Sequence, residues 1–295
     1  MSIFTGSGVA IVTPMYADGT INFDKLGELI DFQIKEGTDS IIICGTTGES
    51  STMTHDEHLE CIRYAVDKVA KRVPVVAGTG SNCTREAVDL SKKAQQVGAD
   101  GLLCVTPYYN KATQAGLAQY YIDIAKSVDL PIIMYSVASR TGCNITPEVA
   151  LKAFKGADNI VAIKEASGNI SQVAKIASIT EGELDIYSGN DDMIVPMMSI
   201  GSKGVISVLA NVAPKQTHDM TAACFAGDYQ TAAKMQLDAL ELINALFCEV
   251  NPIPVKAALN MMGMEVGSLR APLTEMEDKN KEVLLRAMKN YGLVK

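Results

Sequence analysis

Short runs of apolar, mostly β-branched residues recur along the chain, and a longer amphipathic segment follows each of them. The runs are apolar almost throughout, which is typical of parallel strands that are buried on both faces. We therefore predict eight strands, at residues 9–14, 40–44, 74–80, 101–107, 131–137, 160–166, 185–189 and 204–210.

The segments between these runs place apolar residues at helical spacing. Leu26, Leu29 and Ile30 would share one face of a helix. Thr54 and Glu57 have the spacing of a capping box, in which each side chain bonds to the backbone of the other residue at a helix start. We predict further helices within residues 87–97, 114–126, 147–155, 170–179, 191–200 and 213–226.

Eight strand–helix units in about 225 residues predict an α/β fold, the (β/α)8 TIM barrel. An open, doubly wound sheet is the alternative. A G-x-G-x-x-G sequence after the first strand would favour it, and GSGVAIV at 6–12 does not match. The last part of the chain has no strand-like run. We therefore predict a barrel at residues 1–226 and a C-terminal helical domain at residues 227–295.

The composition is that of an ordinary globular protein, with 47% apolar and 20% charged residues among 295. The net charge is −8 and lysines and arginines do not cluster, so the basic face of a nucleic-acid-binding protein is missing. No apolar run reaches about 18 residues, and the first residues have no basic region followed by a cleavage site. We expect a cytoplasmic protein without a membrane span or a signal peptide.

Seven cysteines are scattered along the chain without a C-x-x-C pair, and there are three histidines. An odd number of cysteines, several of them inside apolar runs, is typical of free, buried thiols in a reducing compartment. The cysteines and histidines also lack metal-ligand spacing, so we expect no metal site.

Lys164 interrupts the apolar run IVAIKEA, near the end of the strand, where active sites of (β/α)8 barrels lie. Strand alternation would place it on one face with Ile160, Ala162 and Ala166. If that face points into the barrel, burial would lower the pKa of the ammonium and leave a neutral amine. Such an amine can attack a carbonyl and form a Schiff base. The alternative is a lysine that points outward and pairs with a carboxylate.

Tyr135 ends the neighbouring apolar run, so it would lie beside Lys164 and could shuttle protons during imine formation. A core tyrosine with a satisfied hydroxyl is the alternative. Arg140 follows in the loop, where a guanidinium suits capture of a substrate carboxylate, although a solvated arginine is equally compatible with the pattern.

Three further strand ends carry candidate residues. GTTGES at 45–50 combines two glycines with adjacent hydroxyls, a combination that binds carboxylates or phosphates, but it lacks the ending of a P-loop. Tyr108 and Tyr109 suggest a subunit interface or the wall of a site. Gly189 ends another strand, where a side chain would crowd a ligand. For the aspartates at 191 and 192, which follow it, charge stabilisation of a helix start is favoured over metal binding.

Three of these segments resemble the signature sequences of one family, the dihydrodipicolinate synthase and N-acetylneuraminate lyase family. They are GTTGES followed by Glu57, YSVASRT at 135–141 and IKEAS at 163–167. The resemblance extends from residue 8 to residue 259. It implies a pyruvate-dependent class I aldolase without a metal or other cofactor. It also implies a (β/α)8 barrel with a helical C-terminal domain, assembled as a homotetramer.

The resemblance also implies roles for the residues of the catalytic site. Lys164 would form the Schiff base with pyruvate. Tyr135, Thr47 and Tyr109 would form a proton relay, with Tyr109 supplied by the adjacent subunit. Thr46 would join Thr47 in holding the carboxylate of pyruvate.

The second substrate implied by the synthases of the family is L-aspartate-4-semialdehyde, whose carboxylate Arg140 would bind. Gly189 and Ile206 would line the site. The product would be 4-hydroxy-tetrahydrodipicolinate, in the diaminopimelate route to lysine. The first Thr of GTTGE and Arg140 favour the synthases over the sugar-acid lyases of the family. N-acetylneuraminate lyase, a 2-keto-3-deoxy sugar acid aldolase and a catalytically silent metabolite-binding barrel remain alternatives.

A second group of residues resembles the site at which L-lysine inhibits feedback-regulated members of the family. Its members are Ser50, Ser51, His55, His58, Asn82, Glu86 and Tyr108. Glu86 would pair with an ammonium group of lysine, and Asn82 and Tyr108 would bind its carboxylate.

The chain departs from the family at two positions next to Tyr135. Ser136 and Ala138 stand where the family usually has Asn and Pro. Loss of the proline frees a backbone angle, which raises the entropy of the loop by about 0.4–1 kcal/mol. We therefore expect Arg140 to be held less rigidly than is usual in the family.

Overall fold

The computed structural model describes residues 2–295, and its strands form a closed barrel in chain order from β1 to β8. Every neighbouring pair is parallel, and β8 pairs with β1 to close the barrel. The strands are β1 (Gly6–Ala10), β2 (Ser40–Ile43), β3 (Val75–Gly78), β4 (Gly101–Val105), β5 (Ile132–Ser136), β6 (Ile160–Glu165), β7 (Asp185–Ser188) and β8 (Gly204–Ser207). The prediction of a (β/α)8 barrel is confirmed.

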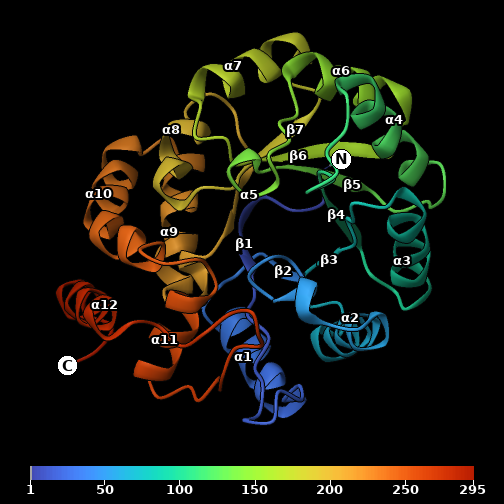
Figure 1. Cartoon of the computed structure of the whole chain (residues 1–295). Coiled ribbons are helices and arrows are strands. Elements are labelled where there is room, and N and C mark those ends of the chain that lie inside the picture. The colour runs from blue at the N-terminus through green and yellow to red at the C-terminus, as the bar shows by residue number, and fades with distance from the viewer. Residues whose placement is uncertain (1) are drawn as a thin grey trace.

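Helices surround the strands, as Figure 1 shows. They are α1 (Phe23–Lys35), α2 (His55–Val69), α3 (Thr84–Gln96), α4 (Gln114–Ala125), the short α5 (Ala138–Thr141), α6 (Pro147–Gly156), α7 (Ile170–Ile179), α8 (Ile194–Met198) and α9 (Pro214–Phe225). Three more follow the barrel: α10 (Tyr229–Leu246), α11 (Ile253–Met261) and α12 (Asp278–Tyr291). Within residues 2–295, none of these helices combines the length and the apolarity needed to cross a membrane.

Six of the helices, α1, α2, α4, α6, α7 and α10, begin at a side chain that caps them. At α2 the Thr54 hydroxyl accepts the Glu57 amide and the Glu57 carboxylate accepts the Thr54 amide, so the predicted capping box is confirmed. The side chains of Asn22, Thr113 and Asn169 accept amide hydrogen bonds at the starts of α1, α4 and α7. Each cap satisfies N–H groups that have no partner inside the helix.

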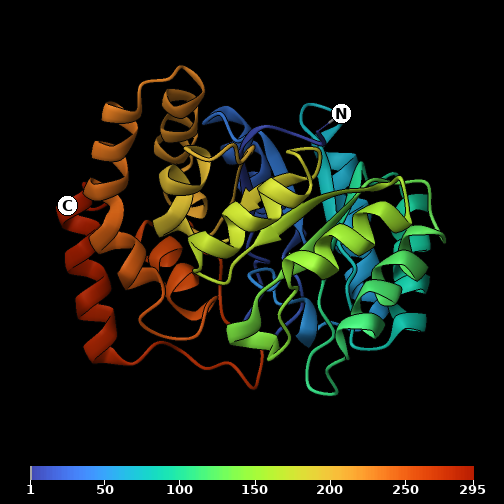
Figure 2. The ribbon, with the colours of Figure 1, turned by 90° about the horizontal axis from the view of Figure 1, so that it is seen from above.

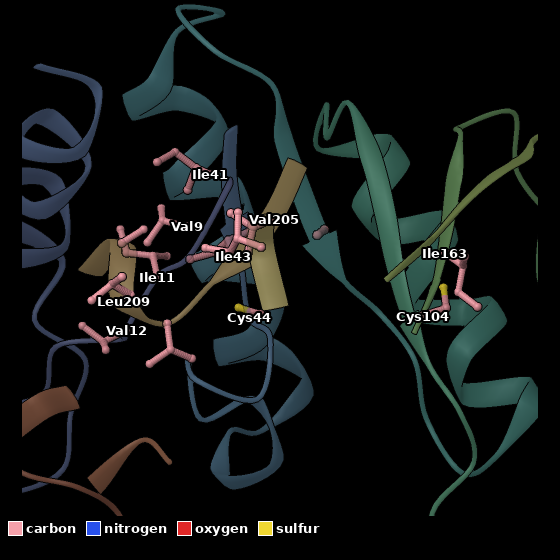
Figure 3. Close-up of a cluster of buried hydrophobic side chains, with 14 of the residues drawn as sticks. Val9, Ile11, Val12, Ile41, Ile43, Cys44, Cys104, Ile163, Val205 and Leu209 are labelled. Atoms are coloured by element: carbon pink, nitrogen blue, oxygen red, sulfur yellow. The ribbon is translucent and has the colours of Figure 1, made fainter. Parts of the chain in front are cut away.

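The barrel has two apolar layers. Side chains such as Ile42, Ile133 and Tyr187 fill its interior. A larger cluster lies between the strands and the helices, and Figure 3 shows part of it, including Val9 and Ile163. Because both faces of each strand are buried, most strand residues are apolar.

Two details of the prediction are wrong. The first strand is Gly6–Ala10, whereas residues 9–14 were expected. Beyond Ala10 the chain leaves the sheet, and the Val12 amide donates to the Asn211 side chain instead of to a strand. Ile160 does not share the inner face of β6, because the pairing between β5 and β6 shifts by one residue at that point.

The C-terminal helices, orange and red in Figure 2, lie together on one side of the barrel. α10 packs against α8, α9 and α12, and α11 packs against α10 and α12. The predicted boundary between residues 226 and 227 falls in the turn between α9 and α10. The division of the chain into two domains stays a prediction.

Candidate active site

A cavity of about 680 Å³ lies at the carboxyl ends of the strands, where barrel active sites are expected. Most of the residues predicted for catalysis and substrate binding line it: Thr46, Thr47, Tyr135, Arg140, Lys164 and Gly189. The end of α10 and the segment between α10 and α11 contribute a further part of the wall, formed by Ile243, Asn244, Phe247, Glu249, Val250 and Asn251. The site is therefore built jointly by the barrel and the C-terminal extension.

Lys164 points into the barrel. It pairs with Tyr135 on β5 and with Tyr187 on β7 in the register of the sheet, and only 5% of it is exposed. Its ammonium nitrogen lies 4.4 Å from the centre of the Tyr135 ring. The alternative of an outward-pointing, solvated lysine is therefore wrong.

Burial lowers the pKa of Lys164 to about 7. The carboxylate of Asp191 raises this pKa and the guanidinium of Arg140 lowers it, both by smaller amounts. About half of the molecules would therefore hold a neutral amine near pH 7. A neutral amine that opens onto a cavity is a nucleophile for carbonyl groups.

Burial raises the pKa of the Tyr135 phenol to about 12, while the charge of Arg140 and the Thr46 hydroxyl lower it. The phenol is therefore protonated at neutral pH. A protonated phenol beside a neutral amine can donate a proton to a carbonyl or hydroxyl group that the amine attacks.

Asp191 is a buried residue of the cavity to which sequence reasoning gave no part in the site. One oxygen of its carboxylate accepts the amides of Val208 and Leu209, 3.0 and 2.8 Å away, at the carboxyl end of β8. Burial raises the pKa of this carboxyl group, and the charge of Lys164 acts against that shift. Asp191 and Asp192 lie in the first turn of the short helix Asp191–Met193, as expected, but the amides that the Asp191 carboxylate binds are at the start of the next short helix, Leu209–Asn211.

Thr47 is tied to the C-terminal part of the chain. Its hydroxyl accepts the side-chain amide of Asn251 at 2.9 Å, and both residues are buried. Sequence reasoning missed Asn251, although it begins the NPIPVK segment that belongs to the family resemblance. The Thr46 hydroxyl lowers the pKa of Tyr135, whereas the predicted proton relay runs through Thr47.

Arg140 lies on the short helix α5 and borders the cavity from the solvent side. Its guanidinium donates to the backbone oxygen of Asn251 at 3.3 Å. Ser136, the first family departure, is buried on β5, where its hydroxyl donates to the Asn144 side chain. Ala138, the second, is the first residue of α5.

Gly189 lies at the end of β7, and a Cβ atom there would come within 2.6 Å of the Ala166 Cβ and 3.1 Å of the Lys164 Cε. The absence of a side chain therefore leaves room for Lys164. Ile206 is buried in the interior of the barrel but does not line the cavity. Tyr109 is 92% exposed, and this chain does not bring it to the cavity.

A second cavity, of about 370 Å³, adjoins the first, and the two share Thr46, Val137 and Arg140. Six of the seven residues predicted for the lysine site line it: Ser50, Ser51, His55, His58, Glu86 and Tyr108. Asn82 does not line it; its backbone oxygen accepts the side-chain amide of Asn110.

Glu86 is the anionic group of this second cavity. The Ser81 hydroxyl donates to its carboxylate, and the His55 ring lies 2.5 Å away. Both contacts lower the pKa of Glu86, so the carboxylate stays charged. His58 is buried, and its Nε2 must carry a proton because it bonds to the Gly78 carbonyl oxygen at 2.8 Å. Burial lowers the pKa of His58, so its ring is neutral at pH 7.

The potential metal ligands and the cysteines lie as follows. Over residues 2–295, we find no group of three or more His, Cys, Asp or Glu side chains placed to hold a metal ion. All seven cysteines are free, and five are buried. Cys83 and Cys248 are exposed, so the expectation of buried thiols is wrong for these two. Both lie at helix ends instead of inside apolar strands.

Known proteins resemble the chain along its whole length. A 4-hydroxy-tetrahydrodipicolinate synthase of Lachnoclostridium phytofermentans is 63% identical over 294 residues, which cover all of both chains. The chloride-inhibited dihydrodipicolinate synthase of Acinetobacter baumannii, solved with pyruvate, is 43% identical. Its TM-score is 0.96, with 98% of this chain and 99% of that one covered. The lysine-bound enzyme of Cyanidioschyzon merolae is 38% identical, with a TM-score of 0.97 and both chains fully covered.

The family model described as the dihydrodipicolinate synthetase family matches residues 3–291. This match spans the barrel, the lysine-bearing strand and the C-terminal helices that complete the cavity. The chain belongs to the dihydrodipicolinate synthetase family.

Proposed function

We propose that the protein is a lyase that condenses pyruvate with L-aspartate-4-semialdehyde to give 4-hydroxy-tetrahydrodipicolinate, in the diaminopimelate route to lysine. The observation that carries this proposal is Lys164, a desolvated amine with a pKa of about 7 that opens onto the cavity beside a protonated tyrosine. The name of the L. phytofermentans relative, which is 63% identical, supports the same activity.

In the proposed reaction, the neutral amine of Lys164 attacks the keto carbon of pyruvate, and loss of water gives an imine. Tyr135 donates the proton that the departing hydroxyl needs. Removal of a methyl proton converts the imine to an enamine, whose carbon attacks the aldehyde. The amine of the second substrate then displaces Lys164 as the ring closes, which frees the enzyme. These steps rely on side chains alone, without a metal or another cofactor.

Pyruvate is an anion and the semialdehyde carries a carboxylate, whereas the chain has a net charge of −8. Local donors must therefore recognise them, because the field of the whole protein does not attract them. We assign the pyruvate carboxylate to Thr46 and Thr47 and the carboxylate of the aldehyde to Arg140. In this proposal Tyr109 completes the proton relay from an adjacent subunit.

The choice of second substrate is tested by coupled assays of the purified protein with pyruvate and either L-aspartate-4-semialdehyde or N-acetylmannosamine. We expect turnover with the semialdehyde and not with the amino sugar. The reverse preference would identify a sugar-acid lyase with the same imine chemistry. Absence of turnover with either, together with no imine to pyruvate, would identify a catalytically silent binding barrel.

The pH dependence of imine formation follows from the pKa of Lys164. Only the neutral amine reacts, so the rate of borohydride trapping with pyruvate should rise with pH and level off above about 7. In Asp191→Asn the rise should move to lower pH, since the Asp191 carboxylate raises the pKa of Lys164. A rise centred near pH 10, the range of an ordinary lysine, would contradict this assignment.

Ala138→Pro is expected to tighten the binding of the semialdehyde. Position 138 is the first residue of α5, where proline is tolerated because the first N–H of a helix needs no partner. The proline would reduce the entropic cost of ordering the loop by about 0.4–1 kcal/mol. Because this loop carries Arg140, the KM for the aldehyde should fall roughly two- to fivefold. Steady-state kinetics measure this effect. An unchanged KM and turnover would show that Arg140 is already held rigidly.

We also propose that L-lysine inhibits the enzyme by binding in the second cavity, as the lysine-bound structure from C. merolae suggests. Glu86→Ala removes the anionic partner of the lysine ammonium, so calorimetry should show lysine affinity reduced about tenfold or more. Glu183→Ala, an exposed position remote from the cavity, is the matched control. Wild-type protein that binds no lysine would dismiss the regulatory proposal.

The assembly and location complete the proposal. We propose a cytoplasmic homotetramer in which Tyr109 and Tyr108, exposed aromatic residues on the loop after β4, lie at a subunit interface. Sedimentation analysis should give a species of four chains. A monomer with full activity would contradict the role of Tyr109 across an interface.

A further inference from the structure

Lys256 on α11 and Glu49 form an ion pair whose two side chains are completely buried, with 2.8 Å between the ammonium and a carboxylate oxygen. Glu49 belongs to the 45–50 segment after β2, the same segment that presents Thr46 and Thr47 to the cavity. The pair therefore joins the C-terminal extension to the substrate side of the barrel. It does not line the catalytic cavity itself.

Both members of the pair are fully engaged. Lys256 also donates to the backbone oxygens of Thr13 and Ser268, at 3.0 and 2.5 Å. The second carboxylate oxygen of Glu49 accepts the Arg270 amide at 3.0 Å. Desolvation of two charges offsets most of what their attraction contributes, so such a pair is weak evidence for a role in stability.

The backbone around Glu49 is a tight turn that needs support. Glu49 has a φ of +57°, a left-handed conformation that is uncommon for a residue with a side chain. Its amide donates to the Thr46 oxygen at 3.1 Å, and the Gly48 oxygen accepts the Thr13 hydroxyl at 2.7 Å. Lys256 donates hydrogen bonds to both Glu49 and Thr13, so its ammonium connects this turn to Thr13.

The same short segment reaches the turn at a second point. Asn251 lies five residues before Lys256 in NPIPVK, and its amide donates to the Thr47 hydroxyl at 2.9 Å. Asn251, at one end of the segment, thus contacts the hydroxyl of Thr47, while Lys256, at the other end, binds the side chain of Glu49, two residues beyond Thr47.

We propose that Lys256 and Glu49 are positioning residues for substrate binding: they hold the 45–49 turn so that the Thr46 and Thr47 hydroxyls face the pyruvate carboxylate. This inference rests on the proposed function, which assigns that carboxylate to the two threonines. The pair acts through the threonines and touches no substrate. Its loss should therefore weaken pyruvate binding more than it slows the chemical steps.

The double variant Glu49→Leu/Lys256→Met tests the inference, because it removes both charges and leaves neither one buried alone. We expect the pyruvate KM to rise about tenfold or more while kcat falls less than about threefold. Glu49→Gln is the milder variant, since it keeps the shape and an acceptor for the Arg270 amide. It should raise the pyruvate KM about threefold. If the double variant does not fold, this variant alone tests the positioning role.

Asp39→Asn is the matched control. Asp39 accepts the Ser7 amide at 2.7 Å and the His218 ring at 2.9 Å, and it lies just before β2, at the opposite end of the barrel from the cavity. This variant should lower the melting temperature without changing the pyruvate KM. A KM within twofold of wild type in Glu49→Gln, or in a folded double variant, would overturn the positioning role.

Borohydride trapping separates this inference from the proposed function. If pyruvate leaves no adduct on the wild-type protein, the proposed function itself fails. If the wild type forms the adduct and the variants reach half-maximal trapping at the same pyruvate concentration as the wild type, only the positioning role fails.

Discussion

Lys164→Met is expected to lower the rate of condensation by roughly 10³-fold or more while the barrel stays folded. Methionine is close to lysine in length and can keep the packing over the Tyr135 ring, but it has no amine to form an imine. Steady-state turnover with pyruvate and L-aspartate-4-semialdehyde measures the loss. Lys175→Ala, at an exposed position on α7, is the control and should turn over normally.

The same variant should be more stable than the wild type. Burial lowers the pKa of Lys164 to about 7 from the 10.5 of a solvated lysine, so the unfolded chain binds an extra proton between these pH values. At pH 7 the buried lysine therefore lowers the free energy of unfolding by roughly 3–5 kcal/mol. This destabilisation decreases as the pH rises toward 10.5. A higher Tm with lost turnover fits a catalytic lysine, whereas a lower Tm would indicate a structural role.

Gly189→Ala is expected to reduce turnover by about 100-fold with little change in fold, because small displacements of a reacting group are costly. The new Cβ would come within 2.6 Å of the Ala166 Cβ and 3.1 Å of the Lys164 Cε. Ala166 directly follows β6, so the clash would push the end of that strand and the amine away from the cavity. Kinetics at saturating pyruvate, together with circular dichroism, measure the two parts of this prediction.

Gly116→Ala on α4 is the matched control, because its Cβ would meet only the Thr113 side chain, at 3.3 Å, and a neighbouring methyl group. It should keep wild-type turnover. Full activity in Gly189→Ala would mean that the end of β7 moves enough to accommodate the new Cβ. Lys164 would then not be confined as the structure indicates.

The barrel was predictable from sequence because most strands are buried on both faces and are therefore mainly apolar. The first strand shows the limit of that signal. Gly6, Ser7 and Gly8 pair in the sheet, although their small side chains give no apolar pattern. Residues 11–13 are buried just as well, but they lie beyond the last residue of the strand.

Lys164 was predictable as a candidate because a charge inside an apolar strand is rare, and its neighbour Tyr135 followed from strand order. Asn251 and Asp191 were not predictable, because their hydrogen-bond partners are far away in the sequence. The partner of Asn251 is 204 residues away and those of Asp191 are 17 and 18 residues away, so neither contact leaves a local pattern. The direction of Lys164 also depended on the register of the sheet, which shifts next to Ile160.

For the second cavity, the family resemblance grouped the residues, and the structure shows which of them line it. Taken alone, His55 and His58 look like surface residues of a helix, and the structure exposes the first and buries the second. Six of the residues matched by resemblance line one cavity, while Asn82 lies outside its wall. The role of Asn82 toward lysine stays a prediction.

The central claim is that Lys164 forms an imine with pyruvate. Reduction of the wild-type protein with borohydride in the presence of pyruvate, followed by peptide mass spectrometry, tests it most directly. We predict one adduct of the size of reduced pyruvate, located on Lys164. Protein that carries no adduct, or that carries it on another lysine, would contradict the claim.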